Sequence, residues 1–195
     1  MTREEWLLQM VERLRPAFAG AGKEIPANVR VSCGWTSTRA LAAKSRSIGE
    51  CWPSQWSKDR THEVFISPCL DEVVAVSATL VHELIHAVLD CEHGHKGPFR
   101  KLALQLGLTG KMTATVAGPE LTERLNALAA AIGPYPHATL DRTMRKKQGT
   151  RMIKVFCVSC GYTVRTTRQW IEMGLPTCVC GCEMEVAGDP GDTDE

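Results

Sequence analysis

The chain has 195 residues, a net charge of +1 and 44% hydrophobic residues, which is enough for one domain of ordinary size and a small appendage. No apolar run approaches the roughly 20 residues that a membrane-spanning helix needs. The start, MTREEWLLQM, is charged where a signal peptide would be apolar. We therefore expect a cytoplasmic protein without a membrane-spanning segment.

The chain opens with a predicted amphipathic helix. Thr2 and Glu5 have the spacing of a capping box, in which each side chain accepts a hydrogen bond from the other residue's backbone N–H. In the segment TREEWLLQMVERLRPAF, apolar residues recur at helical spacing, at Trp6, Met10, Leu14 and Phe18. One face of this helix is therefore expected to pack on a core.

Two strands are predicted next. IPANVRVSCGW alternates apolar and polar residues from Val29 to Trp35, and THEVFISPCL alternates around Val64 and Ile66. The segment between them, SIGECWPSQWS, is rich in Gly, Trp and Ser and is predicted to be a turn region.

Three further helices complete the first part of the chain. Asp71 is expected to cap DEVVAVSATLVHELIHAVLD, and Pro98 to start PFRKLALQL. The first of these helices carries one apolar stripe, formed by Val73, Val76, Leu80, Leu84 and Val88. PELTERLNALAAAI is predicted to end at Gly133. The segment GPYPH then breaks all periodicity, so a domain boundary is expected between Gly133 and Gly149.

His82, Glu83 and His86 spell HExxH within the long helix. Residues four apart lie on the same helix face, so both imidazoles can reach one metal ion. Glu83 lies about 100° round the helix, where its carboxylate can act as general base for a water in the fourth zinc position. The alternative is a pair of core histidines, which leaves the neighbouring Glu83 unexplained.

The third ligand is expected from the glycine-rich loop that follows the motif. His95 is preferred to His93 because the segment GHKGPF leads straight into the next helix. Gly94 and Gly97 can turn the backbone there, and Phe99 can pack behind the imidazole. His93 remains open as a ligand, a substrate contact or a solvated residue. His62 and His137 have no partners at motif spacing and are interpreted as surface or structural residues.

The nine cysteines are unevenly spread, and five of them crowd the C-terminal segment. Cys157 and Cys160 form a CxxC pair followed by glycine, a turn that lets two thiolates face one ion. The second pair is predicted to be Cys178 with Cys180, which is favoured over Cys182. Four thiolates at this separation are typical of a structural zinc site that stabilises a small zinc ribbon; a redox CxxC is the alternative.

The charge is also uneven. Residues 141–175 carry eight Lys and Arg against two acids, whereas residues 176–195 carry six acids and no base. Near the CxxC pair lie two aromatic residues and two cations of the kind that contact unpaired bases and phosphates: Tyr162, Arg165, Arg168 and Trp170. DNA, particularly single-stranded DNA, is therefore a predicted partner. The alternatives are a solvated linker and a stability module with Trp170 in its core.

HELIHAV, GHKGPFRKLA and the closing CxxC segment together resemble the SprT-like metalloprotease family, to which the Spartan proteases that act on DNA–protein crosslinks belong. The resemblance covers roughly residues 2–184. It implies a zincin-like α+β domain in which Glu83 is the catalytic base and the zinc ligands are His82, His86 and His95. It also implies that ISPCL is a strand lining the cleft, to which an extended substrate could add as a strand.

These observations predict four regions: a SprT-like metallopeptidase domain at 1–135, a basic linker at 136–150, a zinc ribbon at 151–187 and an acidic disordered tail at 188–195. The predicted function is a zinc-dependent endopeptidase that acts on DNA-bound or DNA-crosslinked proteins, with one catalytic and one structural Zn²⁺. Two alternatives remain: a nucleic-acid-binding protein with two structural zinc sites, and a regulatory metallopeptidase that does not depend on DNA.

Overall fold

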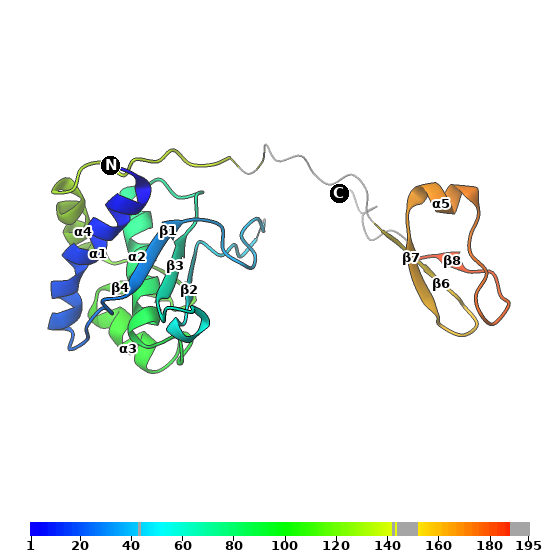
Figure 1. The fold of residues 1–195 in the computed structure, drawn as a ribbon, viewed down its shortest axis with the longest axis horizontal. Coiled ribbons are helices and arrows are strands. Elements are labelled where there is room, and N and C mark those ends of the chain that lie inside the picture. The colour runs from blue at the N-terminus through cyan, green and yellow to red at the C-terminus, as the bar shows by residue number, and fades with distance from the viewer. Residues whose placement is uncertain (43, 142, 144–151, 188–195) are drawn as a thin grey trace. The chain divides into compact units, whose positions relative to one another are not determined.

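The computed structural model describes residues 1–42, 44–141, 143 and 152–187. The chain divides into two compact units, Met1–Thr143 and Met144–Glu195 (Figure 1). Helices and small sheets occur together, so the predicted mixed α and β class is confirmed. The predicted basic linker lies partly outside the described residues, at 142 and 144–150, and the predicted acidic tail lies wholly outside them. Within the described ranges, no helix has the length and apolar character needed to cross a membrane.

Helix α1 (Arg3–Gly20) begins with the predicted capping box. The backbone N–H of Glu5 donates to Thr2 Oγ1 at 3.1 Å, and the Thr2 N–H donates to Glu5 Oε2 at 2.7 Å. The predicted apolar face is fully buried, and Trp6 Nε1–H donates to the carbonyl of Gly133 at 2.8 Å. One buried tryptophan therefore links helix α1 to the segment around Gly133.

The main sheet has three strands, β1 (Val29–Cys33), β2 (Gly49–Trp52) and β3 (His62–Ile66), in the order β1-β3-β2. β1 runs parallel to β3, whereas β2 runs antiparallel to it. The turn region predicted for 47–57 is therefore wrong, because β2 and a 3₁₀ turn (Ser54–Trp56) occupy it. A four-residue strand has little sequence signal of its own and is defined by its pairing with β3.

ISPCL was expected to be the strand to which an extended substrate adds, and the central position of β3 in the sheet contradicts this. ISPCL begins with Ile66, the last residue of β3, and both edges of β3 are already paired with β1 and β2. The two edge strands of this sheet are β1 and β2, and β2 is the one whose residues line the hollow described below. Backbone groups for strand addition are therefore available along β2 and not along β3.

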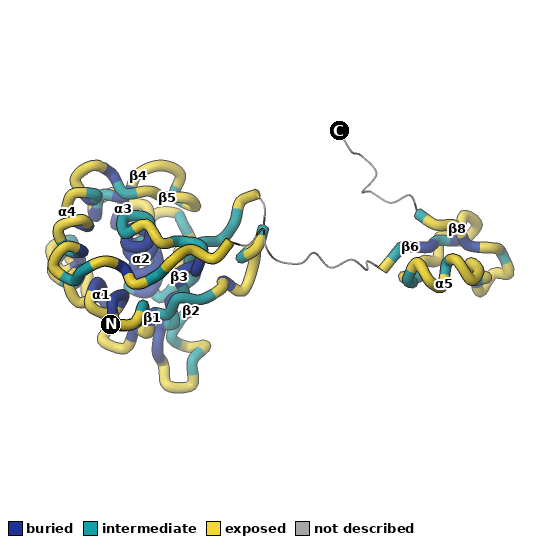
Figure 2. Tube along the Cα trace, turned by 90° about the horizontal axis from the view of Figure 1, so that it is seen from above, coloured by how far each residue is buried: buried dark blue, intermediate teal, exposed yellow. Residues whose placement is uncertain are grey.

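Helix α2 (Val73–Val88) lies in the interior of the first unit, where Figure 2 shows it as a buried element. It contacts β2 and β3 of the sheet and also helices α3 (Pro98–Gln105) and α4 (Pro119–Ala130). The predicted cap at Asp71 is wrong. The helix begins after Glu72, and the Asp71 carboxylate accepts a hydrogen bond from the backbone N–H of Thr139 at 3.1 Å.

A second element was not predicted from the sequence: the hairpin of β4 (Leu108–Lys111) and β5 (Ala114–Ala117). It joins α3 to α4, and β5 contacts α2. The predicted helices on both sides of it are confirmed, and Gly133 adopts a positive φ of 107° just after α4, as expected for a residue that ends a helix.

The C-terminal unit contains β6 (Ile153–Phe156), β7 (Thr163–Thr166), helix α5 (Arg168–Met173) and β8 (Glu185–Val186), with strand order β7-β6-β8. Its apolar core is very small and consists of Val155, Cys157, Cys178 and Met184. So few buried side chains stabilise a fold only weakly, and two of the four are cysteines that belong to a metal-ligand cluster.

Candidate metal centres

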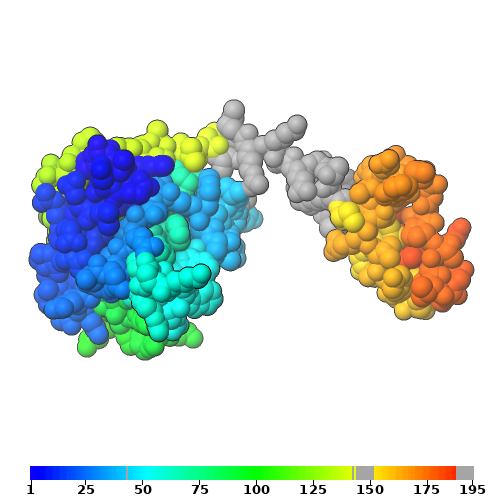
Figure 3. Space-filling model, viewed as in Figure 1, coloured from blue at the N-terminus to red at the C-terminus, as the bar shows by residue number. Residues whose placement is uncertain are grey.

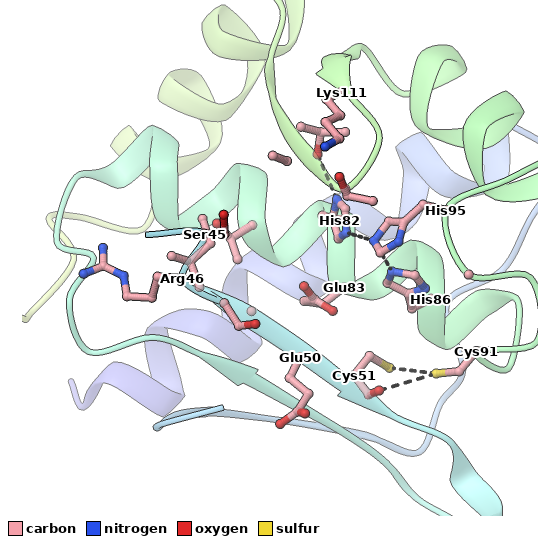
Figure 4. A pocket seen from close by; sticks show the side chains of 18 residues that line it. Ser45, Arg46, Glu50, Cys51, His82, Glu83, His86, Cys91, His95 and Lys111 are labelled. Atoms are coloured by element: carbon pink, nitrogen blue, oxygen red, sulfur yellow. Dashed lines mark hydrogen bonds between the residues drawn. The ribbon is translucent and has the colours of Figure 1, made fainter. Parts of the chain in front are cut away.

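A hollow of about 570 Å³ opens over one face of α2 in the first unit (Figure 4). One wall is β2 with the residues before it (45–51), and the opposite wall is the β4–β5 turn (111 and 113–115). The loop that follows α2 supplies Cys91, Gly94 and His95. Both structural elements that sequence patterns did not predict thus form walls of this hollow.

His82, His86 and His95 meet in this hollow. His82 Nε2 lies 3.0 Å from His95 Nε2, and His86 Nε2 lies 3.3 Å from the same atom. His93 is exposed and is not part of this cluster. Three imidazole nitrogens therefore converge on one point.

The loop from α2 to α3 turns back sharply to deliver His95. Gly94 and Gly97 both have positive φ, 51° and 44°, a conformation that residues with a side chain rarely adopt. Phe99 is fully buried at the start of α3, and its ring centroid lies 4.5 to 5.0 Å from those of all three imidazoles. The expected packing of Phe99 behind His95 is confirmed and extends to the whole cluster.

The hairpin orients one of these rings. His82 Nδ1 lies 2.8 Å from Thr115 Oγ1 on β5. A histidine that binds a metal through one ring nitrogen commonly holds the other nitrogen in such a hydrogen bond, which fixes the ring and its tautomer. Thr115 was missed by sequence reasoning, because it lies more than 30 positions from His82 and belongs to no motif.

The protonation state of the cluster suits a cation. Burial, followed by the neighbouring imidazoles, lowers the pKa of His82 to about 3. Burial and His95 lower the pKa of His86 to about 4, and burial lowers the pKa of His95. All three rings are therefore neutral at pH 7 and offer lone pairs. Tetrahedral zinc with Zn–N bonds of about 2.0–2.1 Å places its nitrogens about 3.3 Å apart, so this donor set fits zinc.

Glu83 lies on the same helix and faces the same hollow (Figure 4). Its side chain is buried beneath β2, where the neighbouring strand residue is Gly49. A Cβ atom added at Gly49 would overlap the Glu83 carboxylate and lie 2.7 Å from Thr79 Cγ2. Glycine at position 49 therefore provides the room for the carboxylate, a requirement that no sequence motif disclosed.

The Glu83 carboxyl is a weak acid in this setting. Burial, followed by the charges of Cys91 and Glu50, raises its pKa to about 8. A cation bound by the histidines would stabilise the carboxylate form and oppose this rise. Strongly shifted pKa values concentrate at functional sites, so Glu83, beside a candidate metal site, is a candidate functional residue.

A pair of thiols flanks the carboxylate. Cys51 on β2 and Cys91 in the loop after α2 both line the hollow, with their Sγ atoms 3.5 Å apart. The hydrogen bond to Cys91 and burial raise the pKa of Cys51, while that same hydrogen bond lowers the pKa of Cys91. Neither cysteine had been assigned a role from the sequence.

The second cluster lies wholly in the C-terminal unit and consists of Cys157, Cys160, Cys178 and Cys180. The Sγ atoms of Cys157 and Cys180 are 3.6 Å apart, and those of Cys160 and Cys178 are 3.4 Å apart. The cysteines come from two tight turns, in which Gly161 and Gly181 have positive φ. This donor set is compatible with a tetrahedral thiolate-bound metal such as zinc.

Cys182 is not part of the cluster. Instead its carbonyl accepts a hydrogen bond from the Cys178 backbone N–H at 2.8 Å, which closes the second turn. Hydrogen bonds, first from the backbone at Cys182 and then from the Cys178 thiol, lower the pKa of Cys180 to about 6. Cys180 is therefore largely a thiolate at neutral pH, which is the ligand form.

The aromatic and basic residues predicted to contact DNA lie on the surface of the C-terminal unit. Trp170 is 56% exposed and Tyr162 is 48% exposed, and both Arg165 and Arg168 are exposed. The alternative in which Trp170 fills the core of this unit is therefore wrong. The remaining cations expected at this surface, Arg142, Arg145, Lys146, Lys147 and Arg151, lie outside the described residues.

The two histidines without motif partners have structural contacts. His62 on β3 is buried, and its Nε2 lies 2.9 Å from Asp90 Oδ1 just beyond α2. His137 Nε2 lies 2.8 Å from the carbonyl of Pro68. Comparisons of the chain with protein-family models, curated proteins and solved structures found no match.

Proposed function

We propose that the protein is a zinc-dependent endopeptidase of zincin type with a C-terminal zinc ribbon. The observation that carries the proposal is the convergence of His82, His86 and His95 beside the buried carboxylate of Glu83. A purely structural zinc site has four protein ligands and no adjacent general base. Here the first unit offers three nitrogens and, next to them, a carboxyl group with a raised pKa.

Bound zinc would supply Lewis-acid polarisation of a peptide carbonyl and a lower pKa for an attacking water. Glu83 then accepts the proton of that water and donates it to the leaving amine. Thr115 keeps the His82 ring oriented through its Nδ1. Phe99 holds the three imidazoles from behind and keeps bulk water from that side.

The polypeptide substrate is proposed to lie along β2. This strand is one of the two edges of its sheet, and it is the edge whose residues 49–51 line the hollow beside Glu83. Addition of an extended peptide to an edge strand supplies main-chain hydrogen bonds that do not depend on sequence. The hollow measures about 570 Å³, which is within the usual range of ligand-binding pockets.

The proposed substrates are proteins bound to or crosslinked on DNA. Exposed aromatic rings and guanidinium groups on the C-terminal unit are suited to bases and phosphates of single-stranded DNA. Binding to DNA would raise the local concentration of the peptidase near such proteins.

The test is cleavage of a DNA-bound protein by the zinc-loaded wild type and by Glu83→Gln, each with and without single-stranded DNA. Gln is isosteric with Glu but cannot accept the proton, so cleavage should fall at least about 100-fold while zinc content and melting temperature are kept. Equal cleavage by both proteins would overturn the proposal. Cleavage that DNA does not stimulate would favour the DNA-independent peptidase.

A further inference from the structure

A second hollow, of about 430 Å³, lies in the first unit and is separate from the histidine cluster. Its wall is aromatic, with Trp35, Trp52, Trp56 and Phe65, and its polar lining residues are Ser37, Glu50, Ser57 and Glu63. Figure 3 shows the segments near residue 55 in cyan and near residue 40 in light blue next to each other on one surface. We call this site the tryptophan hollow.

The tryptophan hollow lies on the face of the sheet that points away from the core. On β2, Gly49 and Cys51 line only the hollow that holds the histidine cluster, which we call the histidine hollow, and Trp52 lines only the tryptophan hollow. Glu50, on the same face of the strand as Trp52, reaches both hollows. On β3, alternate residues are buried on the core side, and Phe65 lies between two of them on the outer side. Side chains alternate between the faces of a strand, so the two hollows occupy opposite sides of β2.

Two of the tryptophans of this hollow are exposed and lie outside the hydrophobic core. Trp56 is 68% exposed and Trp35 is 43% exposed, in contrast to the fully buried Trp6. Trp52 and Trp56 meet edge to face, with ring centroids 5.1 Å apart and planes at 62°, which leaves ring surface open to a ligand. A concentration of large exposed aromatic side chains around a hollow indicates a binding site.

The hollow is negatively charged. Glu50 and Glu63 line it, and no Lys or Arg among the described residues does. Glu63 is paired with Arg30 at 2.6 Å, but Arg30 is shared with Asp59. Glu50 accepts hydrogen bonds from the Ser37 backbone N–H, at 2.8 Å, and from the Ser37 hydroxyl, both neutral donors that leave its charge in place. The exposed Lys58 and Arg60 follow in the chain but do not line the hollow.

We propose that the tryptophan hollow binds an arginine side chain of a basic polypeptide. A guanidinium is planar, stacks on indole rings and forms charge-assisted hydrogen bonds with a carboxylate such as Glu50. Phosphate groups would be repelled by the two glutamates, so a nucleic-acid strand is a poor occupant. A role of this site in substrate selection rests on the proposed function. In that function, a peptide extended along β2 presents alternate side chains to the two hollows.

The probe is the blocked tripeptide acetyl-Gly-Arg-Gly-amide, and its matched control carries citrulline, which has the same shape without the charge. Binding to full-length, zinc-loaded Glu83→Gln protein is followed by tryptophan fluorescence and calorimetry, so that no cleavage interferes. Arginine should bind about tenfold more tightly than citrulline. Trp56→Ala and, separately, Glu50→Gln should abolish that preference, whereas Trp170→Ala should leave it intact.

Equal binding of the two peptides, or a preference that survives Trp56→Ala in a protein with unchanged melting temperature, would overturn the proposal. So would a Trp56-dependent response to oligothymidylate, or a Trp56-dependent dimer in sedimentation without peptide, because each assigns the hollow to another occupant. The measurement requires no hydrolysis. Failure of the endopeptidase proposal, seen as absent cleavage by the wild type, is therefore distinguishable from failure here.

Discussion

At the scale of single residues, the first unit holds one carboxylate in a place that is costly for a charge. Glu83 is the single acidic side chain among the buried residues of the described ranges, and it lies beside three neutral imidazoles. A buried acid is retained only where something compensates its ionisation. A cation bound by the three histidines would provide that compensation.

Gly49→Ala tests whether the carboxylate needs its present position. The added methyl group would displace the Glu83 carboxylate and would also press on Thr79 Cγ2, so activity should fall steeply and stability should fall with it. We expect cleavage to fall about 100-fold with a melting temperature lowered by a few degrees. Gly20→Ala is the control, because no atom lies within 4 Å of its added Cβ. Unchanged cleavage by Gly49→Ala would show that this position is not required.

The raised pKa of Glu83 predicts a pH dependence of folding in protein treated with a chelator. The pKa of Glu83 is about 8 in the folded chain and 4.5 in the unfolded chain, so the folded chain binds this proton more tightly. The protonated carboxyl therefore stabilises the folded state fully below pH 4.5, and this contribution is lost as pH rises towards 8. The loss is on the order of a few kcal/mol. The histidines have lowered pKa values and contribute the opposite slope below pH 6.5.

Denaturant unfolding from pH 4.5 to 8.5 measures this effect. Glu83→Gln should remove the decline in unfolding free energy above pH 5 and should be more stable than the wild type at pH 8. The histidine contribution is common to both proteins and cancels in the comparison. Parallel curves for the two proteins would mean that Glu83 is not held in its protonated form.

At the scale of elements, the sequence predicts those parts of the site whose residues lie only a few positions apart in the chain. His82 and His86 are one helical turn apart on α2, and Cys157 and Cys160 share one tight turn, so local geometry alone brings each pair together. The walls of the site depend on pairing between distant segments. β2 has four residues and is fixed by β3, which explains why composition alone indicated a turn.

The β4–β5 hairpin was also missed because it depends on pairing that the sequence does not signal. The β4–β5 turn at Met112 and Thr113 lacks the Asn-Gly or Asp-Gly signal that identifies a hairpin in a sequence, yet it brings Thr115 to His82. The cap at Asp71 failed for a related reason, since a distant backbone N–H at Thr139 competes for its carboxylate. Non-local partners decided each of these cases.

Thr115→Ala tests the contribution of this hairpin to the metal site. Loss of the hydrogen bond to His82 Nδ1 frees the ring to rotate, so zinc affinity of the first unit should fall about 10- to 100-fold. Competition with a chromogenic chelator measures it. Thr113→Ala, which lines the same hollow without that hydrogen bond, should bind zinc like the wild type. Equal affinities in all three proteins would rule out the orienting role.

At the scale of the whole molecule, two compact units each hold one candidate metal site of different chemistry. The first cluster is made of imidazoles, and the second is made of thiols with a small core around them. Imidazoles with an adjacent carboxylate suit hydrolysis, whereas four thiolates suit a structural metal. The different roles proposed for the two metal sites, one catalytic and one structural, therefore follow from their donor sets.

Trp170→Ala tests the proposed contact between the C-terminal unit and single-stranded DNA. Removal of one exposed stacking surface should weaken binding about 5- to 100-fold, and binding by the wild type should fall steeply with salt. Fluorescence anisotropy of a labelled oligothymidylate measures both. Trp56→Ala, an exposed tryptophan of the first unit, is the matched control and should bind like the wild type. If Trp170→Ala binds the oligonucleotide as tightly as the wild type, Trp170 does not contact single-stranded DNA.

The most direct test of the central claim is the number of zinc ions per chain, counted by native mass spectrometry in the wild type, His95→Ala, His93→Ala and Cys180→Ser. We predict two ions in the wild type and in His93→Ala, and one in each of the other two variants. A wild type with fewer than two ions, or His95→Ala that keeps both, would contradict the assignment of His82, His86 and His95 as one metal site.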